Sequence, residues 1–423
     1  MPRRRRYRPN WPLTLSVAAL VLVVTGYILS SLWPIGVKPG RFASRYDPTM
    51  MLIARSLDTV LALWFLSVGA SIGSFLNVVV YRLPIGRTLN GHSSCPYCRV
   101  PIHAADNIPV FAWLRLRGRC RACRLPISFQ YPAVELLVGI LFLIVYFAEF
   151  AGGGSNLPGG TGGGVRSGLI NTDVSPKLLV RTLILLSGLS CLTAAGLMVI
   201  RSSRVAPSIL IFTILVSLAA AGALPETTIL NWRVGTGIAP IEKHLDAIAT
   251  VLSGGLAGLL IGLITGPTLY SGAKRLQAGD KLSWSVTCAA VGALFGWQTF
   301  PIVLGAVASL AIAATLGFRS LGRRAAGCDW SSDPIVWAWA GVLLVRCNWR
   351  TLEALTVREP GVDAVLHYVF TCCVAMVLTA AAGVLRAILW KPIDLPVVPI
   401  DAAVLPSSEN IGLSENTDEV VIR

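Results

Sequence analysis

Four cysteines arranged as two CxxC pairs are the residues whose spacing points most directly to chemistry. Cys95 and Cys98 form the first pair, and Cys120 and Cys123 follow after 21 intervening residues. A CxxC turn directs two sulfurs at one point, and this spacing is close to that of a tetrathiolate zinc site. Four thiolates complete a tetrahedron with no position left for water, so the spacing predicts a structural zinc site. Free thiols and two disulfides are the alternatives.

The composition around these cysteines is that of a membrane protein. Hydrophobic residues make up 54% of the chain and charged residues 13%, against about 25% charge in soluble domains. Apolar stretches of roughly 18 residues or more, long enough to cross ~30 Å of hydrocarbon, recur along the chain. They are too long and too uniformly apolar for barrel strands, and only helices satisfy the backbone in lipid. The sequence predicts an all-α, polytopic integral membrane protein with about eight to ten transmembrane helices and a small cytoplasmic zinc knuckle.

The predicted spans occupy most of the chain. The first is interpreted as a retained signal anchor, because it is long and lacks a small-residue cleavage site. The spans are residues 12–35, 57–81, 131–150, 178–200, 207–224, 246–270, 282–297, 300–318, 333–347 and 365–390.

Basic residues beside the spans indicate the orientation. The N-terminal stretch "MPRRRRYRPN" is strongly basic and is therefore placed on the cytoplasmic side. The knuckle then lies on the same side, as do residues 201–204, 274–281 and 319–324. A reducing cytoplasm disfavours disulfides in the knuckle. The net charge of +15 reads as a topology signal and not as a nucleic-acid interface, because no soluble domain of useful size carries it.

Composition also divides the chain into segments. A glycine-rich stretch, "AGGGSNLPGGTGGGVRSG", is a flexible connector, and the acidic, Ser/Asn-rich end is predicted to be disordered. No internal repeat is evident. The predicted segments are 1–56 (basic N-terminus and extra signal-anchor helix), 57–150 (helices with the four-cysteine knuckle at about 92–126), 151–177 (Gly-rich linker), 178–345 (helical body), 346–392 (additional helix) and 393–423 (disordered tail).

Several stretches resemble one known family. "GSFLNVVVYRLP", "DNIP", "LRGRC" and "PISFQYPAVELL", together with the two CxxC pairs, are similar to the N-terminal half of type IV prepilin leader peptidases. "LDAIATVLSGGLAGLLIG" and "AAVGALFGWQTFPIVLGAVASL" resemble later helices of the same family. The resemblance implies an intramembrane aspartic endopeptidase in the bacterial inner membrane, which removes the leader of type IV prepilins or pseudopilins at the cytoplasmic face. It also implies N-methylation with S-adenosylmethionine in many members.

The acids that the resemblance implies are mostly missing from this sequence. One family aspartate begins a D-x6-hydrophobic-P-D stretch, where this chain has Ile200 and then Ser208. The other ends a GxGD motif, and an ungapped alignment places Trp284 there. Asp280, in "QAGD", lies four residues earlier, close to one helical turn and roughly 6 Å away. Asp280 is therefore either a displaced catalytic acid or a solvated residue before a helix.

Another carboxylate could supply the missing partner. Glu135 lies near the cytoplasmic end of the third predicted span, and a carboxylate within a membrane is costly and usually functional. It is the best-placed substitute acid. Asp106 is expected instead to cap or order the knuckle loop, and the arginines after it to contact anionic headgroups.

Two hypotheses of different classes follow. The first is a divergent prepilin leader peptidase that uses Asp280 and a second acid, because one carboxylate must act as base while a protonated partner polarises the scissile carbonyl. The second is a pseudoenzyme, a relative that keeps the scaffold and binds pilin-like leader segments or a secretion-system partner without cutting them. The loss of the first aspartate favours lost or altered activity.

Overall fold

The structure is a computed structural model that describes residues 48–91, 93–95, 97–151, 154, 156, 176–201, 204–228, 240–270, 281–320, 333–349, 352 and 371–382. The first predicted span (12–35), Asp280 and the C-terminal tail lie outside these residues. Helices dominate the described part, and its only β pairings are two isolated bridges in the knuckle. The larger helices are α3 (Pro48–Arg82), α4 (Phe111–Leu116), α5 (Gln130–Val145), α6 (Pro176–Ile200), α7 (Pro207–Ala223), α8 (Pro240–Leu269), α9 (Lys281–Phe295), α10 (Phe300–Ser320) and α11 (Pro334–Cys347).

The helices confirm the predicted all-α membrane architecture. Five of them are long and apolar enough to cross a bilayer: Ser56–Ile85, Gln130–Phe150, Leu178–Ile200, Ile241–Leu269 and Phe300–Gly317. Shorter apolar helices occupy Pro207–Ala223, Lys281–Phe295, Pro334–Cys347 and Thr371–Ala382. Each predicted span from residue 57 onward therefore coincides with a helix, the last of them only in its described part.

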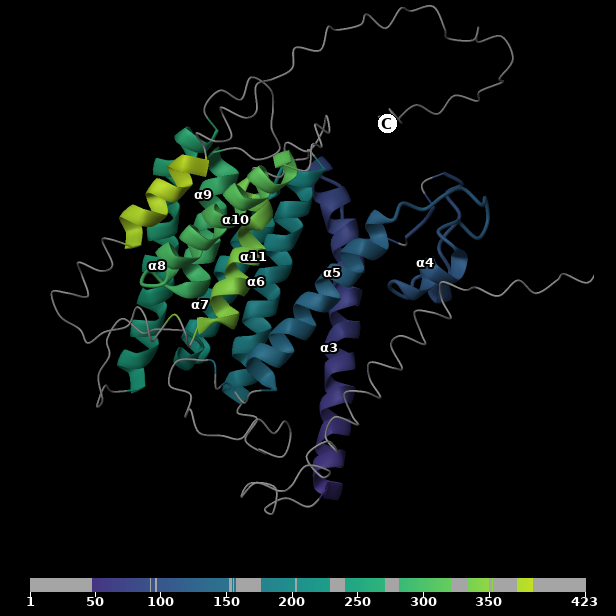
Figure 1. Ribbon diagram of the computed structural model, residues 1–423, viewed down its shortest axis with the longest axis horizontal. Helices are drawn as coiled ribbons and strands as arrows, with labels where there is room; N and C mark the ends of the chain where they lie inside the picture. Colours follow the sequence, from purple (N-terminus) through teal and green to yellow (C-terminus); the bar gives the residue numbers. More distant parts are fainter. Residues whose placement is uncertain are drawn as a thin grey trace, which may run out of the picture. The chain divides into compact units, whose positions relative to one another are not determined.

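Glycines let α3 and α5 pack in close contact, with the knuckle and α4 at one end of the pair (Figure 1). A Cβ on Gly73 would lie 2.7 Å from the Glu135 Cα, and one on Gly69 would lie 2.8 Å from the Val138 carbonyl oxygen. On the α5 side, a Cβ on Gly139 would lie 3.0 Å from a backbone oxygen of α3. Small residues of this kind allow two membrane helices to approach closely.

A second glycine contact joins α8 and α9, the pair with the most extensive helix packing in the described chain. A Cβ on Gly254 would lie 2.2 Å from the Gly292 carbonyl oxygen, and one on Gly258 would lie 2.1 Å from the Cys288 carbonyl oxygen. Glycines of the "SGGLAGLLIG" stretch therefore allow α8 and α9 to pack backbone to backbone.

Gly254→Ala is expected to destabilise the protein by about 1–3 kcal/mol, because the added methyl group would overlap the backbone of α9 and force the helices apart. Thermal unfolding of the purified full-length protein in detergent measures the effect. Gly305→Ala in α10 is the matched control, since its nearest neighbours lie 3.9 Å and 4.0 Å from the added Cβ. A Gly254→Ala protein as stable as the control would contradict the packing argument.

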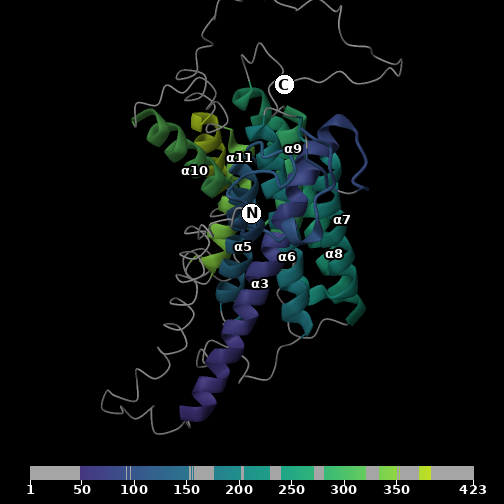
Figure 2. The ribbon, with the colours of Figure 1, turned by 90° about the vertical axis from the view of Figure 1, so that its right-hand side faces the viewer.

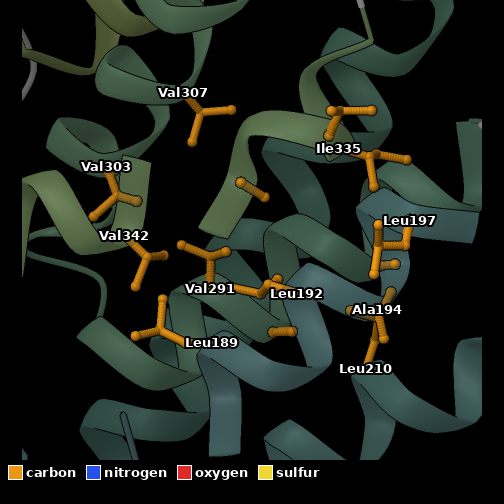
Figure 3. Close-up of a cluster of buried hydrophobic side chains, with 14 of the residues drawn as sticks. Leu189, Leu192, Ala194, Leu197, Leu210, Val291, Val303, Val307, Ile335 and Val342 are labelled. Atoms are coloured by element: carbon orange, nitrogen blue, oxygen red, sulfur yellow. The ribbon is translucent and has the colours of Figure 1, made fainter. Parts of the chain in front are cut away.

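Aliphatic side chains from α6, α7, α9, α10 and α11 form the core of the C-terminal helices. Leu192, Val291, Val303 and Val342 are among the buried side chains that converge there (Figure 3). In this arrangement α6 contacts α7 and also α11 (Figure 2). Aliphatic packing is thus continuous through this part of the described chain.

A buried ion pair links α5 to α11 at the end of α5 that is distant from the knuckle. A π-helical turn (Tyr146–Phe150) extends α5 and carries Glu149, whose side chain has no exposed surface. The Nε of Arg346, near the end of α11, donates to one Glu149 carboxylate oxygen, while the other oxygen has no hydrogen-bond partner. Asn156 adds a 2.7 Å hydrogen bond to the Arg346 carbonyl. Two segments far apart in sequence are therefore joined by a fully desolvated charge pair.

Candidate metal centre and acidic residues

The four predicted cysteines lie together at the tip of the knuckle. All four sulfurs are within 4.8 Å of one another. The Cys95 and Cys123 sulfurs are 3.9 Å apart, and the Cys98 and Cys120 sulfurs are 4.0 Å apart. Sulfurs on a tetrahedral zinc ion with Zn–S bonds of about 2.3 Å are separated by about 3.8 Å. The cluster can therefore hold a metal ion with little movement, and its geometry is compatible with zinc.

Two equivalent turns build this cluster and form a short repeat that the sequence reading missed. Residues 95–102 and 120–127 both read C-x-x-C-R-[V/L]-P-I. The Arg99 N–H donates to the Cys95 carbonyl at 2.9 Å, and the Arg124 N–H donates to the Cys120 carbonyl at 3.1 Å. Each turn is closed by an isolated β-bridge at its base. The expectation of no internal repeat is therefore wrong for this eight-residue segment. The repeat is easily overlooked, because the two residues between the cysteines differ between the two copies.

Both turns place an arginine in the left-handed region of backbone conformation. The φ angles of Arg99 and Arg124 are 57° and 64°, and Arg117, which caps α4, has a φ of 54°. An L-residue with a side chain pays about 1–2 kcal/mol for this conformation, whereas glycine adopts it freely. Three of the knuckle arginines thus occupy positions where the backbone alone favours glycine.

The thiols of the cluster differ in acidity. The backbone N–H groups of Cys123 and Ala122 lower the pKa of the Cys120 thiol to about 6. Although the Leu125 N–H lowers it, desolvation and the neighbouring thiols raise the pKa of Cys123 to about 11. Crowded thiols cannot all ionise unaided, and a divalent cation would supply the compensating charge.

Asp106 orders the knuckle loop, as predicted. Its Oδ1 accepts from Arg115 at 2.7 Å, and its Oδ2 accepts from Arg121 at 2.5 Å. The Arg121 side chain, with Arg115, holds the pKa of this carboxyl below its usual range. The Asp106 side chain is only 5% exposed and pairs with both guanidinium groups. Asp106 therefore links its own part of the loop to the parts that carry Arg115 and Arg121.

Glu135 lies in the first turns of α5 and faces the knuckle. Its Oε2 accepts a 2.7 Å hydrogen bond from the Val110 N–H, and the Ser74 side chain also hydrogen-bonds the carboxylate. Val110 itself has a φ of 61°, a strained value for a β-branched residue. The carboxylate therefore connects α3, α5 and the knuckle loop, and sequence reasoning did not foresee this bond to the backbone.

The positions that the resemblance aligns with family aspartates carry no acid. Ile200 ends α6, and Ser208 is exposed at the start of α7. Trp284 is 2% exposed, and its indole N–H donates to the Thr265 hydroxyl at 2.9 Å. Asp280 lies outside the described residues, so the geometry of a pair with Glu135 is an open prediction.

A buried carboxylate that the sequence reading overlooked, Asp333, lies at the knuckle end of the C-terminal helices. It is 1% exposed and accepts from the Tyr270 hydroxyl at 2.9 Å and from the Ile335 N–H at 3.0 Å, capping α11. A Cβ on Gly196, one turn before the end of α6, would lie 3.2 Å from the Val336 Cα. Asp333 is therefore close to the end of α6. The sequence signal was an aspartate directly before the proline that begins an apolar helix.

The comparisons with known proteins include a family-model match to the α3–knuckle–α5 segment. The family model of the bacterial peptidase A24 N-terminal domain matches residues 67–149. A prepilin leader peptidase/N-methyltransferase of Neisseria gonorrhoeae is 42% identical over 102 residues, which cover 18% of this chain and 36% of that relative. No solved structure matches this chain.

Longer matches at lower identity cover most of the chain. The prepilin leader peptidase/N-methyltransferase of Dickeya chrysanthemi is 29% identical over 305 residues, covering 65% of this chain and 88% of the relative. The protein of the same name from Pectobacterium carotovorum subsp. carotovorum is 30% identical over 289 residues, covering 62% of this chain and 85% of the relative. From this extent of similarity, the chain belongs to the prepilin leader peptidase/N-methyltransferase family.

Proposed function

We propose that this chain is a membrane-embedded endopeptidase that removes the leader of type IV pilin-like precursors at the cytoplasmic face of the bacterial inner membrane. The observation that carries the proposal is the similarity to prepilin leader peptidases over more than 60% of the chain. The chemistry requires a base to activate water and a protonated acid to polarise the scissile carbonyl. Glu135 and Asp280 are the proposed pair.

Within this proposal the knuckle holds zinc and does not cut. Four thiolates would fill the coordination sphere of the ion and leave no site for a water nucleophile. The metal would therefore stabilise the fold of the knuckle and take no part in cleavage. The hydrogen bond from the Val110 N–H to Glu135 supports this structural role of the knuckle, because it fixes the knuckle loop beside the carboxylate. The family resemblance implies S-adenosylmethionine as the methyl donor.

A second candidate function is favoured by one specific observation. Isoleucine, serine and a buried tryptophan stand where the family resemblance expects aspartates. A chain of this kind could bind pilin-like leader segments without cleaving them and serve as an assembly scaffold. The two candidates share the fold, the knuckle and the substrate class, and they differ only in catalysis.

Cleavage of a type IV prepilin in membranes containing the full-length protein separates the two candidates. Glu135→Gln and Asp280→Ala are each expected to reduce cleavage by about 10²–10⁴-fold, the usual contribution of a general acid or base. Glu242→Gln, an exposed glutamate at the start of α8, is the matched control and should cleave normally. Mass spectrometry of the pilin N-terminus distinguishes uncut, cut and methylated products.

The outcomes assign the function. Loss of cleavage in both variants supports the enzyme and this pair of acids. Cleavage that survives both substitutions supports the enzyme but rejects the pair, and Asp333→Asn is then the next variant, because asparagine keeps the helix cap while removing the acid. Absence of cleavage of every cognate pilin-like precursor by the wild-type protein rejects the enzyme and leaves the scaffold.

A further inference from the structure

The knuckle carries a strong excess of positive charge. Residues 83–129 contain a single carboxylate, Asp106, which is almost fully buried between Arg115 and Arg121. All seven arginines of this segment are exposed. They are Arg87, Arg99, Arg115, Arg117, Arg119, Arg121 and Arg124. The surface that the knuckle presents is therefore dominated by guanidinium groups.

Three of these arginines have a backbone conformation that residues other than glycine rarely adopt. Arg99, Arg117 and Arg124 have φ angles between 54° and 64°, where glycine would be free of strain. Arg99 and Arg124 occupy the same position in the two repeated turns. Strained residues of this kind concentrate at functional sites. A guanidinium at both equivalent positions points to an anionic ligand that the knuckle contacts from both turns.

The knuckle lies between two helices that are long and apolar enough to cross a membrane. The membrane-spanning segment before it ends at Ile85, and the next begins at Gln130, so neither side has a linker that would let it leave the surface. Exposed aromatic side chains lie at the start of α5, namely Phe129 (68% exposed) and Tyr131, and another, Phe111, begins α4. Aromatic rings favour the headgroup region of a membrane.

We propose that the knuckle is a binding module for anionic phospholipid headgroups, with Arg99, Arg117 and Arg124 as the residues that contact lipid phosphates. Guanidinium groups match phosphate oxygens in a bidentate geometry, and juxtamembrane basic residues are attracted to anionic lipid. The metal turns would hold two of these arginines in a fixed geometry, so lipid binding and metal binding are linked. The proposal is independent of whether the chain cleaves prepilins.

The test uses the full-length, metal-loaded protein in nanodiscs of phosphatidylcholine with a minority of phosphatidylglycerol. Native mass spectrometry after release gives the ratio of the two lipids that stay bound. For the wild type, phosphatidylglycerol is expected to be enriched several-fold over the nanodisc composition. The triple variant R99G/R117G/R124G is expected to lose this enrichment while its metal content stays unchanged, because glycine relaxes the backbone at each position.

Matched variants distinguish the effect of the arginine charges on lipid binding from an effect on the fold. R99K/R117K/R124K keeps the charges and is expected to retain most of the enrichment, and Arg204→Gly removes an exposed arginine outside the knuckle and should change nothing. If the glycine variant loses its metal, R99Q/R117Q/R124Q tests lipid enrichment instead. It removes the three charges while keeping a side chain at each position with a positive φ. Wild-type enrichment in a charge-free, metal-loaded variant would overturn the proposal. Displacement of the lipid by millimolar inorganic phosphate would also overturn it and indicate a small-anion site.

Discussion

Replacing Cys120 with serine is expected to abolish metal binding and unfold the knuckle. Three thiolates cannot close a tetrahedral site, and structural zinc sites in small domains supply about 10–16 kcal/mol of apparent binding free energy that is also folding free energy. Metal content measured by mass spectrometry should fall from one ion per chain to close to none. Amide exchange should rise at Arg99 and Arg124, whose N–H groups close the two turns.

Cys191→Ser is the control for this substitution. Cys191 lies on α6, outside the four-sulfur cluster, so the variant should keep its metal and its knuckle protection. The same measurement identifies the metal, because a tetrahedral four-sulfur site accepts iron as well as zinc. A Cys120→Ser protein that retains one ion, or a wild type that holds iron, would contradict the zinc assignment.

Breaking the ion pair between Glu149 and Arg346 is expected to have the second large effect. Removal of Arg346 leaves the buried Glu149 carboxylate without its hydrogen-bonded partner, with Arg181 as a remaining nearby cation, and breaking a buried pair in this way costs about 3–5 kcal/mol. Arg346→Ala should therefore lower the free energy of unfolding by that amount, since Glu149 already has one carboxylate oxygen without a partner. Chemical denaturation of the full-length protein in mixed micelles measures the change.

The double variant E149M/R346M provides the decisive comparison. Apolar residues of similar volume remove both desolvation penalties, so the double variant should be more stable than either single variant. Glu242→Ala, at an exposed site, should stay within about 0.5 kcal/mol of the wild type. Strictly additive losses in the double variant would show that the two side chains do not act as a pair.

Most of the fold could be predicted from hydropathy because the lipid environment allows few alternatives. The span predicted at 131–150 is observed as Gln130–Phe150, and the one predicted at 178–200 as Leu178–Ile200. Hydropathy does not report helix beyond the apolar part, so the start of α3 at Pro48 was missed. The contact of Glu149 with Arg346 spans 197 residues, and no local pattern in one sequence encodes such a partner.

Part of the candidate site could likewise be predicted from the sequence, and part could not. Cysteine spacing alone predicted which sulfurs would meet, because a CxxC turn fixes the geometry of each pair. The bond from Val110 to Glu135 depends on a loop whose path is set by tertiary contacts, and the left-handed φ angles of the arginines contradict their residue type. These features follow from the assembled structure and could not be read from local preference.

The glycine contacts between α3 and α5 have a consequence for the order of biosynthesis. Since Gly69, Gly73 and Gly139 hold the two helices together, the ends of the intervening loop are brought near each other before any metal arrives, which reduces the entropy that coordination must overcome. All four cysteines and both helices precede residue 151. A nascent chain emerging from the ribosome could therefore load its metal and complete this hairpin before the later helices are translated.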